Sequence, residues 1–217
     1  MRDRYTILVG LIFLVIVVVA FVNGIGSDEH TLGLEAQEAR WPLPEFAVPA
    51  ATGPLEGDAN IAQDDCTSPT VPCPAGERRL PACRIRTAGA IRVCDFFDRP
   101  AVISFWFSKG GDCIGQQDIV NRVFARYRGR VRFLSLDIRD DRETLRGLVR
   151  SHRWRMPVGY DRDGAVAGLY RVGGCPTFAY AYPGGTLQSA SIGNLTAAGL
   201  GERVEQLLRA TAAAEAG

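Results

Sequence analysis

Apolar residues recur along the second half of the chain with two different periods, one typical of strands and one typical of helices. Two short runs rich in β-branched and aromatic residues, 101–107 and 131–138, predict buried strands. Apolar positions spaced three or four residues apart predict three helices. The first follows Asp112 as its N-cap, the second carries Leu145 and Leu148 on one face, and the third follows Asn194 as its N-cap.

Two further strand-like runs, 177–182 and 186–192, are separated by the Pro-Gly-Gly sequence at 183–185, which is typical of a hairpin turn. The predicted order is strand, helix, strand, helix, hairpin, helix. Alternation followed by a hairpin favours an α/β fold with a mixed central sheet and helices on both faces.

The chain begins with a hydrophobic segment of a different kind. Tyr5 to Gly26 contains no charged residue and would be about 33 Å long as a helix, enough to cross the roughly 30 Å hydrocarbon layer. Arg2 and Arg4 precede it, and Asp28 and Glu29 follow it. By the positive-inside rule we expect residues 1–26 to be a cytoplasmic N-terminus and single-pass anchor, with the rest of the chain outside the cell membrane. A cleaved signal peptide is the alternative, and it also exports the chain.

The remaining segments differ in composition. Residues 27–43 are predicted to be a tether, 44–210 a folded domain, and 211–217 a tail. Within the domain, residues 54–88 are rich in Pro, Gly, Ala, Asp and Thr and show neither period, so we expect an irregular insertion. An irregular stretch of this length needs covalent bonds to hold it.

Composition excludes some functions. The chain has 217 residues and a formal net charge of +1, which argues against nucleic-acid binding. A single lysine among 25 basic residues suggests a bacterial protein from a GC-rich genome. No phosphate-binding loop and no His/Cys cluster at metal-ligand spacing occurs in the sequence, so we expect no cofactor and no metal. Asp137 and Asp161 stand at strand ends, where such residues usually serve as caps.

Six cysteines provide the candidate chemistry. Export places them in an oxidising compartment, so we expect disulfides and not free thiols. They are Cys66, Cys73, Cys83, Cys94, Cys113 and Cys175.

In order and spacing, the sequence resembles the thioredoxin superfamily, and within it the membrane-anchored TlpA/ResA-type (redoxin) branch. The resemblance implies a thioredoxin-like fold, with Pro176 as the cis-proline before the final hairpin, and thiol–disulfide oxidoreductase activity in cell redox homeostasis. It covers residues 44–209, and the segments that carry it are 44–49, 99–108, 156–161, 164–170, 175–178 and 183–185.

The chain departs from the family at the redox motif. The family has Cys-x-x-Cys directly after the Phe-Trp strand, whereas this chain has Gly110, Gly111, Asp112 and Cys113. The attacking cysteine of the family is therefore replaced by Gly110, and Cys113 corresponds to the resolving one.

Cys175 directly precedes the cis-proline, and in this family that loop packs against the start of the helix carrying the motif. The resemblance therefore implies a Cys113–Cys175 disulfide. Three hypotheses follow: the bond is structural in a redox-inactive binding scaffold, it is a relocated catalytic pair, or Cys113 is a peroxiredoxin-like peroxidatic cysteine. The expected partners are thiols or disulfides of exported proteins, or an envelope protein.

The other four cysteines most simply pair locally, Cys66 with Cys73 and Cys83 with Cys94. These short loops lie in and beside the predicted insertion. Each bond is expected to contribute about 2 to 3 kcal/mol by constraining the unfolded chain.

Overall fold

The computed structural model divides into two compact units, residues 1–32 and residues 33–217. In the first unit only Phe13 to Val15 are described; they are helical, and their side chains are exposed. Among the described residues no helix has the length and apolar character needed to cross a membrane. Most of the predicted anchor at 5–26 lies outside the residues that the structure describes. The described residues are 13–15, 33–55, 62–63, 67–68, 71–72, 81–109 and 111–216.

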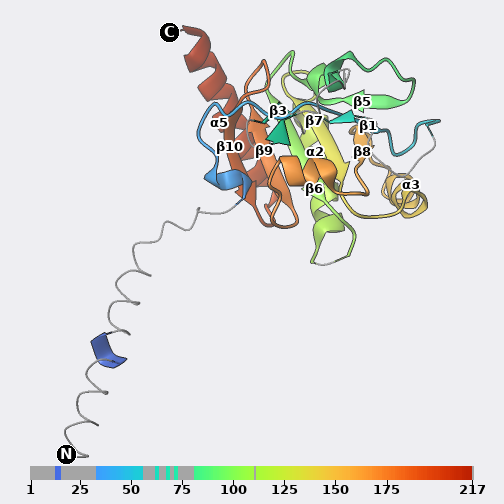
Figure 1. The fold of residues 1–217 in the computed structure, drawn as a ribbon, viewed down its shortest axis with the longest axis horizontal. Coiled ribbons are helices and arrows are strands. Elements are labelled where there is room, and N and C mark those ends of the chain that lie inside the picture. The colour runs from blue at the N-terminus through green and yellow to red at the C-terminus, as the bar shows by residue number, and fades with distance from the viewer. Residues whose placement is uncertain are drawn as a thin grey trace, which may run out of the picture. The chain divides into compact units, whose positions relative to one another are not determined.

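A five-stranded mixed sheet forms the centre of the second unit (Figure 1). The strands β6, β7 and β8 are parallel, while β9 runs antiparallel to β6, and β10 antiparallel to β9. The mixed sheet predicted from the sequence is confirmed. In spatial order the strands are β10 (Leu187–Ile192), β9 (Thr177–Ala181), β6 (Ala101–Trp106), β7 (Arg132–Asp137) and β8 (Val158–Tyr160).

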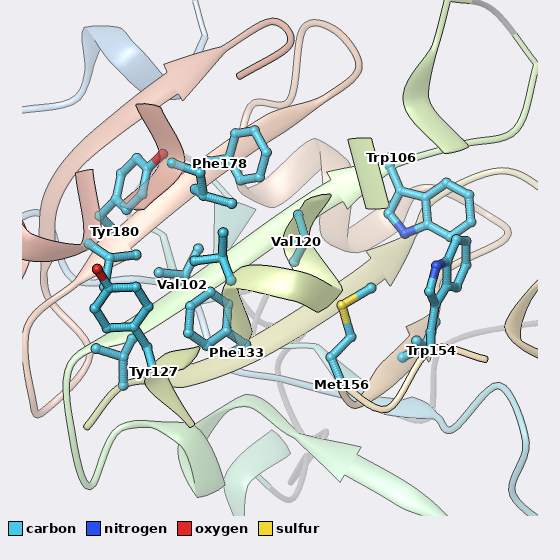
Figure 2. Packing of buried hydrophobic residues seen from close by; sticks show 14 of the residues in the cluster. Val102, Trp106, Val120, Tyr127, Phe133, Trp154, Met156, Phe178 and Tyr180 are labelled. Carbon is cyan, nitrogen blue, oxygen red and sulfur yellow. The ribbon is translucent and has the colours of Figure 1, made fainter. Parts of the chain in front are cut away.

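The strands β6 and β9 are buried on both faces of the sheet, which is why they are almost continuously apolar. Alternate residues of β6 point to opposite faces: Val102 and Trp106 belong to one core cluster, and Ile103 and Phe105 to the other. Figure 2 shows the first cluster, where the rings of Trp106 and Trp154 meet edge to face with centroids 5.3 Å apart.

Helices cover both faces of this sheet. The first core cluster lies under α2 (Cys113–Tyr127) and α5 (Ala197–Ala216), and it receives Leu145 from α3 (Arg142–Ser151). The second lies under the short α4 (Ala165–Leu169). The expectation that Asn194 caps the last helix is wrong. The helix begins at Ala197, and the hydroxyl oxygen of Thr196 accepts the hydrogen bond from the amide of Gly199.

The domain begins earlier than the predicted boundary at residue 44. The short 3₁₀ helix η1 (Leu34–Ala36) places Leu34 in the core with no exposed surface. The amide of Arg40 donates to the carbonyl of Leu187, and that of Leu43 to Gly185. Residues 33–43 therefore pack on the sheet, and the predicted tether covers part of the domain. At the other end α5 continues through Ala216, where a tail at 211–217 was expected.

A second sheet lies beside the second core cluster. The strand β1 (Phe46–Pro49) pairs antiparallel with β2 (Ala62–Gln63) and β5 (Ala90–Arg92). The insertion at 54–88 therefore contributes ordered elements: besides β2 it contains β3 (Thr67–Ser68), β4 (Val71–Pro72) and the 3₁₀ helix η2 (Ala82–Arg84). A disulfide joins Cys83 in η2 to Cys94 in the 3₁₀ helix η3 (Val93–Phe96), with Cα atoms 5.8 Å apart, as predicted. The predicted Cys66–Cys73 bond lies outside the described residues.

Candidate functional site

The site lies where β6 ends and α2 begins. Asp112 is the N-cap of α2, and its side chain accepts a hydrogen bond from the amide of Gly115 at 3.2 Å. Gly115 leaves room for this carboxylate, because a Cβ atom at that position would collide with it. Gly111 has a φ of +64°, a conformation suited to glycine. Cys113 is therefore the first residue of the helix. Gly110, the position of the missing cysteine, lies outside the described residues.

The second half of the site is the loop before β9, where the Cys175–Pro176 peptide bond is cis. Two hydrogen bonds fix this loop: the hydroxyl of Thr177 donates to the carbonyl of Gly174 at 2.7 Å, and the amide of Gly193 donates to the carbonyl of Pro176 at 2.9 Å. The loop is thereby tied to itself and to the end of β10.

A disulfide joins Cys113 to Cys175 across 62 residues of sequence, with Cα atoms 6.2 Å apart. The two cysteines differ in exposure. Cys113 is 1% exposed, whereas Cys175 is only partly buried, and its Sγ lies 3.8 Å from the carbonyl oxygen of Phe107. The Cys175 side is therefore the more exposed side of the bond. Because Cys113 is buried, peroxide has no approach to its sulfur, which argues against a peroxidatic role for this cysteine.

Beneath α2 a chain of buried hydrogen bonds connects three elements. Trp106 Nε1 donates to Ser135 Oγ at 2.8 Å, Ser135 Oγ donates to Gln117 Oε1 at 2.9 Å, and Gln117 Nε2 donates to Ser104 Oγ at 2.8 Å. All four side chains are fully buried. None of them titrates, so this network positions α2 against the sheet and supplies no proton. Sequence reasoning missed it, although two serines inside apolar strands are a signal for such a network.

Asp137 and Asp161 stand at the ends of the neighbouring strands β7 and β8. Burial, and then the neighbouring carboxyl of Asp140, raise the pKa of Asp137 to about 8. Asp161 accepts hydrogen bonds from the amides of Val166 and Ala167, so it caps the start of α4. The expectation that these residues serve as caps holds for both, since Asp137 Oδ1 accepts hydrogen bonds from the amides of Arg139 and Asp140 in the turn after β7.

An open pocket of about 410 Å³ lies beside the loop that carries Cys175. Its wall includes Gly174, the residue before Cys175, and Phe107, whose carbonyl oxygen contacts the Cys175 sulfur. Arg139 lines the same pocket, with its guanidinium 5.9 Å from the centre of the Phe107 ring. The pocket is therefore bordered by two neighbours of Cys175, one in sequence and one in space.

One group of possible metal ligands occurs among the described residues, formed by Glu45, Cys83 and Cys94, whose ligand atoms lie within 4.8 Å of one another. The two sulfurs are joined to each other, and the Glu45 carboxylate accepts a hydrogen bond from the amide of Cys83 at 3.2 Å. The disulfide and this hydrogen bond account for the cluster without a metal.

No protein-family model matches the chain, and no curated protein matches it. Solved structures do. The proposed thiol:disulfide interchange protein DsbE of Chlorobium tepidum is 18% identical and covers 80% of this chain and 97% of its own, with a TM-score of 0.57. The thioredoxin domain of a thiol-disulfide oxidoreductase from Bacteroides vulgatus is 11% identical, covers 78% and 97%, and has a TM-score of 0.55. A DsbF homologue from Corynebacterium diphtheriae is 12% identical, covers 79% and 87%, and has a TM-score of 0.54.

These likenesses extend over most of the chain and of each neighbour. The sheet order, the helices on both faces and the cis-proline before β9 were derived above without them. With the structural neighbours added, the conclusion is that this chain has the thioredoxin-like fold.

Proposed function

We propose that this protein is a thiol–disulfide oxidoreductase whose redox pair is Cys113 and Cys175. The observation that carries the proposal is the unequal exposure of the two cysteines: the bond joins a buried cysteine at a helix N-terminus to a partly exposed cysteine in a loop that borders a pocket. A buried bond would serve structure alone, whereas exchange needs one sulfur that a thiolate can approach.

The exchange follows from this polarity. A substrate thiolate attacks the sulfur of Cys175, the Cys113–Cys175 bond breaks, and Cys113 leaves as a thiolate. A second substrate thiol loses its proton to solvent and attacks the mixed disulfide, which forms the substrate disulfide and releases Cys175 as a thiolate. Two substrate thiols are oxidised and the pair is reduced. In the reverse direction Cys175 attacks a substrate disulfide and Cys113 resolves it.

The helix supports the role of Cys113. The thiolate that forms when the bond breaks lies at the N-terminus of α2, where the helix dipole stabilises negative charge and lowers the pKa of a thiol. Asp112 opposes this effect with its own negative charge. A thiolate with a lowered pKa is a good leaving group, so attack at Cys175 is favoured.

We further propose that the protein acts outside the cytoplasm on thiols or disulfides of exported proteins, anchored by the segment 5–26. Support comes from the length of that uncharged segment, the arginines before it and the acidic residues after it. The disulfides of the second unit agree with an oxidising compartment. Membership of the TlpA/ResA-type branch is part of the same proposal.

A redox titration tests the function. The full chain in detergent micelles is equilibrated with defined ratios of oxidised and reduced dithiothreitol, and the oxidised fraction of the pair is read by thiol alkylation and peptide mass. We expect a potential between about −270 and −120 mV, the range of known exchangers. A value below about −300 mV overturns the proposal.

That second result would favour the other candidate function, a redox-inactive scaffold that binds an envelope partner. The specific observation on its side is the burial of Cys113, which is common for structural disulfides. A structural bond of this loop length would contribute about 4 kcal/mol to stability.

A further inference from the structure

Two buried acidic side chains hold the loop between β6 and α2 from behind. Asp140 accepts two hydrogen bonds from Ser108, from its amide at 2.5 Å and from its hydroxyl at 2.6 Å. Asp137 Oδ1 in turn accepts hydrogen bonds from the amides of Arg139 at 3.1 Å and Asp140 at 2.8 Å. Asp137 therefore shapes the turn that presents Asp140, and Asp140 fixes Ser108.

Burying these two carboxyls side by side lowers the stability of the fold, which indicates that they have a role other than stabilising it. Asp137 is 0% and Asp140 5% exposed, and two neighbouring carboxyls in a buried place cannot both ionise without a large electrostatic cost. Within the described part of the chain, Asp137 Oδ2 has no hydrogen-bond partner. Burial, and then the neighbouring Asp140, raise the pKa of Asp137 to about 8, so Asp137 keeps its proton at neutral pH.

Charged groups lie near Asp137 on the β8 side and on its own turn, and a neutral side chain lies on the β6 side. On the β8 side lies Asp161, whose amide donates to the carbonyl of Asp137 at 2.7 Å and whose carboxylate is occupied by the amides at the start of α4. On the β6 side its partner in the strand register is the neutral Trp106. On its own turn follow Asp140 and Arg139, and the guanidinium of Arg139 lies over the ring of Phe107.

The segment that the pair holds is in contact with the redox sulfur. Ser108 follows Phe107 directly, and the carbonyl oxygen of Phe107 lies 3.8 Å from Cys175 Sγ. We propose that Asp137 and Asp140 are positioning residues for the disulfide: while Asp137 is protonated they hold the segment 107–108 against Cys175, and when Asp137 ionises they release it. The catalytic meaning of this role rests on the proposed function, whereas the positioning concerns the bond itself.

The release follows from electrostatics. Ionisation of Asp137 places a second negative charge beside Asp140 in a buried place, so the turn through Arg139 and Asp140 loses stability. The hydrogen bonds that Ser108 donates to Asp140 then weaken, and the Phe107 carbonyl moves away from the sulfur more often. An external reductant reaches Cys175 more easily in that state.

The test is the reduction rate of the Cys113–Cys175 bond by a phosphine reductant between pH 6 and 9.5, in the full chain and in Asp137→Asn. Asparagine keeps an accepting Oδ1 and stays neutral, so it mimics the protonated acid, and the ratio of the two rates cancels the pH dependence of the reagent. We expect a ratio near one at pH 6. At pH 9.5, about 1.5 units above the pKa, linkage allows at most about a 30-fold effect, and we expect the parent to react about tenfold faster.

A second measurement follows the contact directly. The amide resonance of Ser108 in a ¹⁵N-labelled protein should titrate together with the rate ratio in the parent and stay fixed in Asp137→Asn. Ser108→Ala removes one of the two hydrogen bonds to Asp140 and should react faster than the parent at pH 6. Asp98 is an exposed carboxylate that pairs with Arg132 at the start of β7; Asp98→Asn is the matched control and should behave as the parent.

A rate ratio that stays constant from pH 6 to 9.5 overturns the positioning role, as does a Ser108 amide that does not titrate in that range. These outcomes are separate from failure of the proposed function. A redox titration typical of a structural disulfide would remove the exchange activity and leave the pH-dependent ratio intact, whereas a flat ratio leaves the redox titration unaffected.

Discussion

Trp106 donates its indole N–H to the hydroxyl of Ser135 at 2.8 Å, across two neighbouring parallel strands and beneath α2. The Ser135 hydroxyl donates to Gln117 Oε1, and Gln117 Nε2 donates to the hydroxyl of Ser104, so one glutamine side chain bonds to two strands at once. The polar chain fixes the rotation of α2 about its axis, and with it the direction in which Cys113 points. Its members are therefore part of the site although none can react.

Replacing Gln117 by leucine should destabilise the protein by about 2 kcal/mol, because the buried hydroxyls of Ser104 and Ser135 lose a partner. Denaturant-induced unfolding measures the loss. Arg122→Leu, on an exposed position of the same helix, is the control and should change stability by less than about 0.5 kcal/mol. Equal effects of the two substitutions would contradict the network.

Asp112→Ala should cost about 1 kcal/mol of stability, because the amide of Gly115 loses the side chain that caps α2. Asp112→Asn keeps an accepting oxygen and should retain most of this stability. The asparagine variant also removes the negative charge next to Cys113, so we expect it to lower the pKa of that thiol in the reduced protein. Thermal unfolding and a thiolate absorbance titration give the two readouts. If Asp112→Asn lost as much stability as Asp112→Ala, the hydrogen bond from Gly115 would not be what stabilises the start of α2.

The pH dependence of stability should change in Asp137→Asn. The pKa of Asp137 is raised from its ordinary value of 3.8 to about 8, so its contribution is fully present below pH 4 and is lost as pH rises towards 8, where the unfolded chain has released the proton and the folded protein still holds it. Asparagine does not titrate. The variant should therefore gain stability relative to the parent between pH 4 and 8, on the order of 5 kcal/mol by pH 8. Parallel unfolding curves across this range would show an unperturbed carboxyl.

The polarity of the redox pair can be read from single-serine variants. In Cys113→Ser the remaining Cys175 is accessible and should form a mixed disulfide with an unfolded, reduced protein in the presence of an oxidant, or with a small aromatic disulfide. In Cys175→Ser the remaining Cys113 is buried, and its reaction should be slower by about tenfold or more. Peptide mass identifies the labelled cysteine in each case. Faster labelling of Cys113 would reverse the proposed roles.

Gly110→Cys combined with Cys175→Thr should create the usual pair of the family and reduce insulin faster than the parent, with dithiothreitol as donor. The reason is that Cys113, the N-cap and the cis-proline are already in place, so one accessible attacking thiol completes the arrangement. Cys175→Thr alone is the control, since it removes the competing cysteine without adding an attacking one. An inactive but folded double variant would show that more than one cysteine has been lost.

Much of the fold follows from short-range patterns. The strands at 101–106 and 132–137 and the helix that begins after Asp112 were predicted within one or two residues, because backbone periodicity and capping depend on neighbours in sequence. The last helix was placed with the wrong cap, since both Asn194 and Thr196 suit that position and only packing selects between them. The early residues at 33–43 were misjudged because their two buried residues, Leu34 and Leu43, are too far apart in sequence to show a period.

The candidate site divides in the same way. The sequence by itself determined which cysteines exist, that the family's attacking position is a glycine, and that Cys175 stands before a proline. Only the tertiary structure decided that Cys175 is the more exposed cysteine and Cys113 the buried one, and that Asp140 raises the pKa of the buried Asp137. Exposure and pKa depend on the atoms that surround a side chain, and those atoms come from β7, β9 and α2, segments that folding brings together from distant parts of the chain.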